Sequence, residues 1–72
     1  MLVGTVPAFD YQGEGAKVDS LVPDSPAAKA GLKAGDVIVR IDDNKIRDLR
    51  GYSDVLKQLT PNQTVTFEVL RR

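Results

Sequence analysis

The sequence predicts a small α+β domain in which helices pack on a mostly antiparallel sheet. Three observations predict this class. The 72 residues suffice for one domain, and 42% of them are hydrophobic, which is enough for a single modest core. The predicted elements run strand, strand, short helix, strand, long helix, strand. Helices set beside such a sheet are typical of α+β folds, so we expect residues 1–72 to form a single domain.

The first predicted strand covers Leu2 to Val6 and is followed at once by Pro7. Because proline has no backbone N–H, it confines a strand to the edge of a sheet. The polar, glycine-containing segment "AFDYQGEG" (Ala8 to Gly15) predicts a loop. A second strand follows at Ala16 to Val22, and Pro23 ends it. The chain is therefore expected to begin with an edge strand and its neighbour.

The segment "SPAAKAGL" predicts a short helix with a cap at each end. Ser25 is a good N-cap and Pro26 suits the first helical position. Ala27 to Ala30 favour the helix. Gly31 supplies the left-handed residue that follows it, with Leu32 as the apolar contact of the C-terminal cap.

The run Val37 to Ile41 is rich in β-branched residues and is predicted to be the central strand. The turn before it, Lys33 to Asp36, requires a positive φ that Gly35 adopts without strain. Asp42 to Asn44 predicts a second turn, and Lys45 with Ile46 a short return strand.

The segment from Leu49 to Leu59 predicts an amphipathic helix, which Thr60 to Asn62 end. Its apolar stripe is formed by Leu49, Tyr52, Val55, Leu56 and Leu59. By periodicity alone, such a stripe is more often core than ligand groove. The last segment, Thr64 to Leu70, alternates strictly between apolar and polar residues and predicts a half-buried strand.

The composition excludes several classes of function. Ten basic and ten acidic residues cancel, so no nucleic-acid partner and no anionic membrane surface is indicated. No apolar run reaches the roughly 18 residues of a membrane span, so membrane insertion is not expected. The chain contains no histidine and no cysteine. It therefore lacks the usual general base, the usual metal ligands and a thiolate nucleophile.

Three short motifs suggest chemistry, but a structural interpretation is preferred for each. Ser25 and Lys29 lie four residues apart on a predicted helix, yet capping accounts fully for the serine. Asp42 to Asn44 lacks the spaced ligands, glycine and distal glutamate of a calcium loop. The "GEG" of Gly13 to Gly15 is not followed by the lysine and serine of a phosphate-binding loop. We therefore predict no catalytic residue, no metal site and no cofactor.

The stretch "VDSLVPDSPAAKAGLKAGDVIVRIDDNKI", Val18 to Ile46, resembles the PDZ domains of bacterial proteases. An apolar strand is followed by P-x-S-P-A, A-G-L and A-G-D-x-I, and the resemblance extends over Leu2 to Leu70. Similar modules occur in high-temperature-requirement serine proteases, tail-specific proteases and secreted zinc aminopeptidases. The opening "GTVPAFDYQGEG" looks most like the aminopeptidase group.

The resemblance implies a partly open β-barrel or sandwich with one short and one long helix. It also implies the permuted bacterial strand order, in which the carboxylate-binding loop opens the domain. The family's usual last strand would lie beyond Arg72 and is missing from this sequence. The domain itself would not be catalytic. It would belong to a larger periplasmic or extracellular protease, with the catalytic domain of the parent chain as one partner.

The resemblance further implies a peptide-binding module for peptide or protein C-termini, or for unfolded substrate segments. In such domains the backbone amides of an x-Φ-G-Φ loop hold the ligand carboxylate, and the ligand adds to the sheet as a strand. The corresponding amides here are those of Val3, Gly4 and Thr5. Val6 and Pro7 would continue the edge that pairs with the ligand. The groove on the long helix would be lined by Tyr52, Val55, Leu56 and Leu59.

Two departures from the family pattern leave a second hypothesis open. Thr5 stands where a large hydrophobe is usual, and Pro7 removes a backbone donor from the ligand-binding edge. The alternative is a structural or regulatory domain whose groove is occupied by its own chain or by a neighbouring domain. Pro7 favours this alternative, whereas Gly4 and the apolar helix stripe favour peptide binding.

Overall fold

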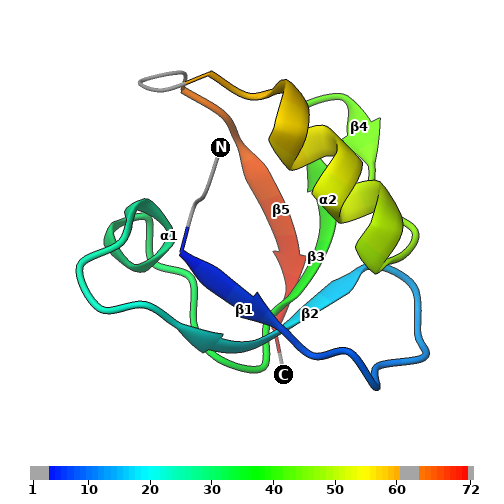
Figure 1. The fold of residues 1–72 in the computed structure, drawn as a ribbon, viewed down its shortest axis with the longest axis horizontal. Coiled ribbons are helices and arrows are strands. Elements are labelled where there is room, and N and C mark those ends of the chain that lie inside the picture. The colour runs from blue at the N-terminus through cyan, green and yellow to red at the C-terminus, as the bar shows by residue number, and fades with distance from the viewer. Residues whose placement is uncertain (1–3, 61–63, 72) are drawn as a thin grey trace.

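The computed structural model describes residues 4–60 and 64–71, and its elements follow one another in the predicted order (Figure 1). They are β1 (Thr5–Pro7), β2 (Ala16–Leu21), α1 (Pro26–Lys29), β3 (Val37–Ile41), β4 (Asn44–Lys45), α2 (Leu49–Gln58) and β5 (Phe67–Leu70). The predicted α+β class is confirmed.

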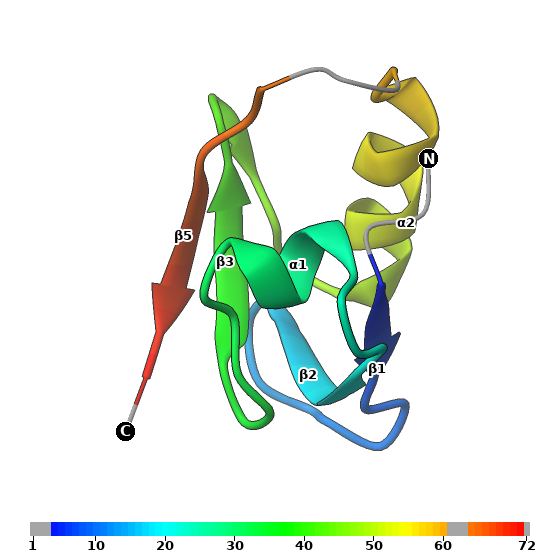
Figure 2. The same cartoon turned by 90° about the vertical axis from the view of Figure 1, so that its left-hand side faces the viewer.

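The strand β3 lies at the centre of the sheet, as its β-branched sequence predicted. It pairs antiparallel with β2, β4 and β5. In the described part of the chain, β1 pairs only with β2, again antiparallel. No pairing joins β1 to β5 among these residues, so the sheet stays open rather than closing into a barrel. Figure 2 shows α2 and β1 on the side of the molecule opposite β5.

The core lies between the sheet and α2. Its buried members come from β2, β3, the segment after β4, and α2, and they are Ala16, Val18, Ile38, Ile41, Ile46 and Tyr52. Val55 and Leu56 of α2 are only partly buried and pack against this cluster. The stripe predicted on the long helix is therefore divided, with Tyr52 in the core and the other apolar side chains at its margin.

The short helix α1 has both predicted caps. The Ser25 hydroxyl accepts a hydrogen bond from the Ala28 N–H at 3.2 Å. At the other end, the N–H groups of Gly31 and Leu32 donate to the carbonyls of Ala28 and Ala27, each at 3.1 Å. This is the Schellman arrangement, which satisfies carbonyl groups at the end of a helix. The structural interpretation of Ser25 is confirmed.

The last strand is shorter than predicted. Burial alternates along Thr64 to Leu70 as expected, but the pairing with β3 begins only at Phe67. The reason lies in the turn after β3. Asp42 donates its N–H to the Thr66 carbonyl at 2.8 Å, and its carboxylate accepts from the Thr66 N–H at 2.8 Å. Hydrogen bonds from the turn residue Asp42 thus take the place of backbone pairing between β3 and the first residues of the predicted strand.

The boundary of the first strand also differs from the prediction. Leu2 and Val3, which the sequence assigned to this strand, lie outside the described residues. Pro7, predicted to follow the strand, is its last residue. This is possible because β1 is an edge strand, where a missing N–H leaves no ladder bond unmade on the open side.

Candidate functional site

The candidate site is the space between the open edge of β1 and the helix α2. A direct contact shows that the two elements are neighbours. The Thr5 hydroxyl and the Tyr52 hydroxyl lie 2.7 Å apart and share a hydrogen bond, although the two residues are 47 positions apart in the chain. Thr5 is partly exposed and Tyr52 is 3% exposed. This bond, which we call the hydroxyl bridge, joins the edge strand to the helix.

Gly4, the predicted loop glycine, occupies a position that only glycine fits. Its φ is +91°, in the left-handed region that other residues rarely adopt. A Cβ at this position would also overlap the side chain of Ser25, the N-cap of α1. The chain therefore enters β1 by passing directly over the start of α1. Val3, whose amide was predicted to contribute to the same carboxylate site, lies outside the described residues.

The hydrogen bonds between β1 and β2 determine which backbone groups of β1 face the open edge. The Gly4 carbonyl accepts from the Val22 N–H at 2.8 Å, and the Ala8 N–H donates to the Lys17 carbonyl at 2.9 Å. Because bonded groups alternate along an antiparallel strand, Val6 also turns its backbone toward β2. Thr5 and Pro7 are left facing outward.

The open edge therefore offers three backbone groups between Thr5 and Pro7: the N–H and carbonyl of Thr5 and the carbonyl of Pro7. Val6 was predicted to belong to the pairing edge; like Thr5 and Pro7 it has a partner on β2, Ser20, and the alternation turns its backbone groups toward that strand. Its side chain is 40% exposed. Pro7 stands at an outward-facing position, so its missing donor affects a guest strand and not the sheet of the domain itself.

The predicted groove residues of α2 divide into two groups. Val55, Leu56 and Leu59 are half-buried, and Val55 and Leu56 pack against the core cluster. Tyr52 is buried and touches β1 through the hydroxyl bridge. Burial raises the pKa of the Tyr52 phenol above its ordinary value of 10.0, and the bond to Thr5 opposes this shift only in part. The phenol therefore remains a neutral hydrogen-bonding group at neutral pH.

The hydroxyl bridge is the feature of the site that sequence reasoning missed. Thr5 was recognised as an unusual residue after the glycine, and Tyr52 as part of an apolar stripe. Their spacing in the chain gives no sign that the two hydroxyls meet. As a result, two hydroxyl groups lie where β1 meets α2, next to Gly4, whereas the family pattern leads one to expect a large hydrophobic side chain at position 5.

Other chemistry finds no support in the described part of the chain. Among residues 4–60 and 64–71, no group of three or more acidic, histidine or cysteine side chains is placed to hold a metal ion. The Asp42 side chain, considered above for calcium, is bonded to the Thr66 N–H instead. None of the described helices has the length and apolar character needed to cross a membrane.

The chain resembles known proteins over most of its length. Residues 3–72 match the family model described as "PDZ domain". A protein from Bartonella henselae named "Probable periplasmic serine endoprotease DegP-like" is 48% identical over 44 residues, which cover 61% of this chain and 9% of that protein. A protein of the same name from Pseudomonas fluorescens is 37% identical over 65 residues, which cover 90% of this chain and 13% of that protein.

These relatives bear on several predictions made from the sequence. Their names agree with the predicted protease parent and with the predicted periplasmic or extracellular localisation. They are endoproteases, so the likeness of the opening segment to aminopeptidases is not supported. The chain spans only about a tenth of the length of these relatives, 9% and 13% of the two described above.

Proposed function

This chain belongs to the PDZ domain family, and we propose that it binds the C-termini of extended peptides within a larger periplasmic serine endoprotease. The observation that carries the proposal is the open edge of β1, which the hydroxyl bridge joins to the amphipathic helix α2. A peptide can add to such an edge as a further strand and place its side chains against the helix. In this role the module would deliver substrate to the catalytic domain of the parent chain.

The proposed carboxylate site uses backbone amides and no charged side chain. Gly4 takes a positive φ at the entry to β1, a conformation found where successive N–H groups converge on an anion. We assign the ligand carboxylate to the amides of Gly4 and Thr5, together with that of Val3. The polar floor formed by the Thr5 and Tyr52 hydroxyls favours a small last residue over a large hydrophobic one.

The proposed edge pairing is weaker than in a domain that has a donor at position 7. A guest strand running antiparallel to β1 finds the Thr5 N–H and carbonyl, but only the carbonyl of Pro7. One missing backbone hydrogen bond weakens binding by roughly 0.5–1.5 kcal/mol. Since each 1.4 kcal/mol is tenfold in affinity, we expect binding in the high-micromolar range.

A titration of the isotopically labelled domain with matched peptides tests the proposal. The two peptides have the same sequence, one with a free C-terminal carboxylate and one with a C-terminal amide. We expect the free acid to shift the backbone amide signals of Gly4 to Val6 and to bind about tenfold more tightly. Peptide binding is rejected if neither peptide perturbs these signals at millimolar concentration. Equal binding of both peptides would reject the carboxylate site.

The same titration tests the alternative of a domain whose groove is occupied from within the parent protein. Two observations favour this alternative: Pro7 faces the open edge, and the Thr5 and Tyr52 hydroxyls are hydrogen-bonded to each other. Under this alternative, short peptides do not bind to the isolated domain, whereas a linked neighbouring segment of the parent protein does.

A further inference from the structure

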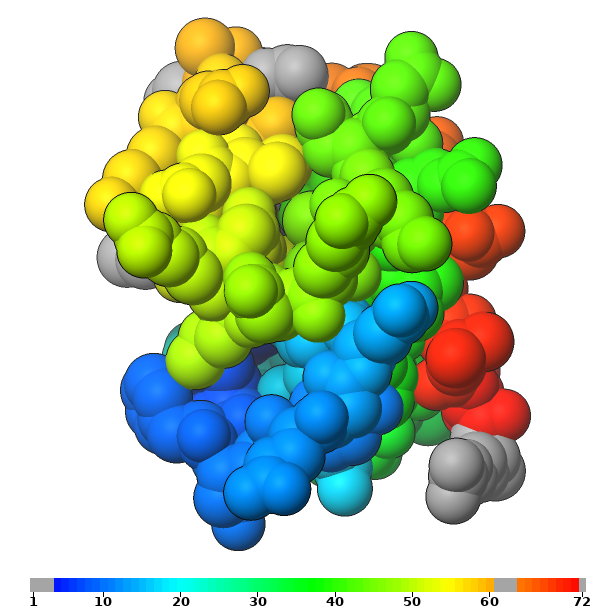
Figure 3. All heavy atoms as spheres, turned by 90° about the vertical axis from the view of Figure 1, so that its right-hand side faces the viewer, coloured from blue at the N-terminus to red at the C-terminus, as the bar shows by residue number. Residues whose placement is uncertain are grey.

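A hollow of about 580 Å³ lies where the end of β5 and the turn before β3 meet the β1–β2 loop. In Figure 3 the blue loop and the red β5 lie in the lower part of the view, with green atoms between them. The side chains that matter for its chemistry come from the loop, from three strands and from the turn, and they are Tyr11, Lys17, Lys33, Val37, Leu70 and Arg71.

The pairing of three strands determines the floor of this hollow. Lys17 of β2 is directly opposite Val37 of β3, and Val37 is directly opposite Leu70 of β5. Directly opposed residues have their side chains on the same face of a sheet. The three residues therefore form one row, which is about 10 Å long because neighbouring strands lie about 4.8 Å apart.

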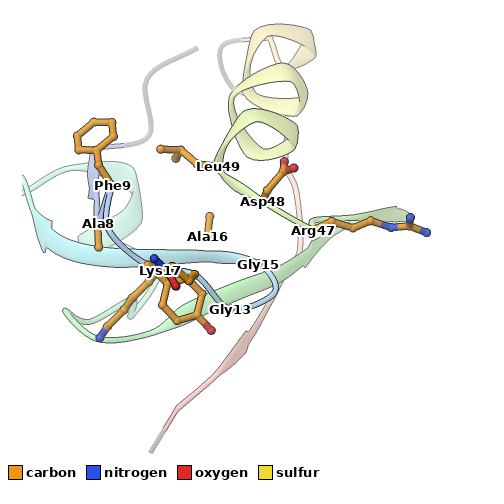
Figure 4. A pocket seen from close by; sticks show the side chains of 11 residues that line it. Ala8, Phe9, Gly13, Gly15, Ala16, Lys17, Arg47, Asp48 and Leu49 are labelled. Atoms are coloured by element: carbon orange, nitrogen blue, oxygen red, sulfur yellow. The ribbon is translucent and has the colours of Figure 1, made fainter.

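This row is on the face of the sheet that points away from α2. Ala16, Ile38 and Val69 are each next in sequence to a residue of the row, and they belong to the core or pack against it. Because side chains alternate along a strand, the row points to the other face. In Figure 4 the Ala16 side chain points toward α2, whereas that of Lys17 extends away from the helix.

The floor of the hollow is apolar and accessible. Leu70 is 61% exposed and Tyr11 is 36% exposed, although large apolar side chains are normally covered. The Tyr11 hydroxyl donates to the Glu14 carbonyl at 3.3 Å, and the Lys17 ammonium lies 5.9 Å from the centre of the Tyr11 ring. An aromatic ring and a leucine from separate elements thus face solvent on the same side of the sheet.

The accessible charge around the hollow is positive. Among the described residues that line it, Asp36 is the only acidic one. Its side chain is 2% exposed, and the Arg71 guanidinium balances its charge. The ammonium groups of Lys17 and Lys33 form no ion pair with any described carboxylate. Two cations therefore lie beside an apolar floor in a chain whose net charge is zero.

We propose that this hollow, which we call the back surface, binds an extended acidic segment of a partner protein. An apolar side chain of the segment would lie on Val37 and Leu70, and acidic side chains on either side of it would approach Lys17 and Lys33. Charge complementarity of this kind orients a partner and accelerates its association. The back surface shares no residue with the edge of β1, so the two sites can be occupied together.

Three peptides, each acetylated at the N-terminus and amidated at the C-terminus, test the back surface. The first is Gly-Glu-Ser-Leu-Ser-Glu-Gly, in which the leucine and both glutamates share one face when the peptide is extended. The second has serine in place of the leucine, and the third has lysine in place of both glutamates. The C-terminal amide keeps all three out of the proposed carboxylate site.

We expect the first peptide to shift the amide signals of Val37 and Leu70 in the isotopically labelled domain. It should bind about fivefold more tightly than the serine peptide, because it buries a leucine side chain in part. The lysine peptide should not bind at millimolar concentration. Raising the salt concentration from 0.05 to 0.5 M should weaken binding of the first peptide, since salt screens exposed charges.

Four variants complete the experiment. Lys17→Gln and Lys33→Gln should each lower the affinity for the first peptide by about two- to threefold. Leu70→Ala removes an exposed side chain, so the fold should remain intact, and it should abolish the preference for leucine over serine. Lys57→Gln is the matched control, because it removes an exposed lysine from α2, and it should retain the full affinity.

The back surface is rejected if the leucine and serine peptides bind equally, because the site would then attract anions in general. It is also rejected if Lys57→Gln weakens binding as much as Lys17→Gln does, or if the shifted signals are those of Gly4 to Val6. If the signals of Val37 and Leu70 shift when the domain alone is concentrated, the occupant is a second copy of the chain and the acidic segment is rejected. None of these outcomes bears on the proposed function, which requires a free C-terminal carboxylate.

Discussion

Single residues in this domain carry two roles where the fold and the site meet. Gly4 allows the chain to enter β1 with a positive φ, and its lack of a side chain makes room for Ser25. Tyr52 fills the core and places its hydroxyl on Thr5 at the base of the groove. A change at either residue therefore affects stability and ligand binding together, and the two effects must be measured separately.

Replacing Gly4 with alanine tests how strongly this position requires glycine. We expect Gly4→Ala to lower the free energy of unfolding by about 2–5 kcal/mol, from the left-handed backbone and from the overlap with Ser25. Urea denaturation measures the change. Gly31→Ala is the matched control, because Gly31 has a φ of +95° but open space around its missing Cβ. It should lose only about 1–2 kcal/mol, and an equal loss in both variants would contradict a role for the Ser25 contact.

At the scale of elements, the strands and helices with strong local signals were predicted well. The caps of α1, the central strand β3 and the extent of α2 all follow from nearby residues. The start of β5 did not follow, because Asp42 bonds the backbone of Thr66 from a different part of the chain. Periodicity also could not predict that Tyr52 of α2 is buried whereas Leu56 is only partly buried, because burial depends on the residues that pack against the helix.

The edge of β1 yields a prediction in which a substitution strengthens binding. Pro7→Ala restores a backbone N–H at a position facing the open edge. We expect the affinity for a free-acid peptide to rise by about 2- to 10-fold, which corresponds to one recovered hydrogen bond. Isothermal titration calorimetry measures this change.

A second proline provides the control for this experiment. Pro26 lies in the first turn of α1, next to the Ser25 cap, but contributes no backbone group to the open edge of β1, so Pro26→Ala should leave the affinity within about twofold of the wild-type value. Unchanged affinity in Pro7→Ala as well would show that a ligand does not pair with β1 at this position.

At the scale of the whole molecule, one buried carboxylate connects the end of the chain to its middle. Asp36, which precedes β3, is 1% exposed. It accepts two hydrogen bonds from the Arg71 guanidinium, at 2.8 and 2.9 Å, and one from the Lys33 N–H at 2.9 Å. Arg71 also donates to the Gly31 carbonyl at 3.0 Å. This pairing could not be predicted from local patterns, because the partners lie 35 residues apart.

This pair predicts how stability depends on pH. Hydrogen bonding to Arg71, partly opposed by burial, lowers the pKa of the Asp36 carboxyl below its ordinary value of 3.8. A carboxyl group whose pKa is lower in the folded than in the unfolded state stabilises the fold at pH values above its unfolded-state pKa. This stabilisation is lost as the pH falls through the folded-state pKa. We therefore expect wild-type stability to fall below about pH 4, and Arg71→Gln to weaken this dependence.

Thermal unfolding between pH 2 and pH 7 measures the effect. At neutral pH, Arg71→Gln should lower the melting temperature by roughly 5 °C or more, because it leaves a buried carboxylate without its main partner. The control is Arg40→Gln, which breaks an ion pair to Glu68 at 3.8 Å with both side chains more than half exposed. Such surface pairs contribute little. Similar losses in the two variants would contradict the role assigned to Asp36.

The contact between Gly4 and Ser25 has an evolutionary consequence. Asparagine and aspartate cap helices about as well as serine does, but each has a larger side chain, and Ser25 is buried against Gly4 with only 8% of its surface exposed. The start of α1 and the loop proposed to hold the ligand carboxylate thus share one small space. Among homologues that keep both elements, positions 4 and 25 should vary together or not at all, even though Ser25 is not among the residues proposed to hold the ligand.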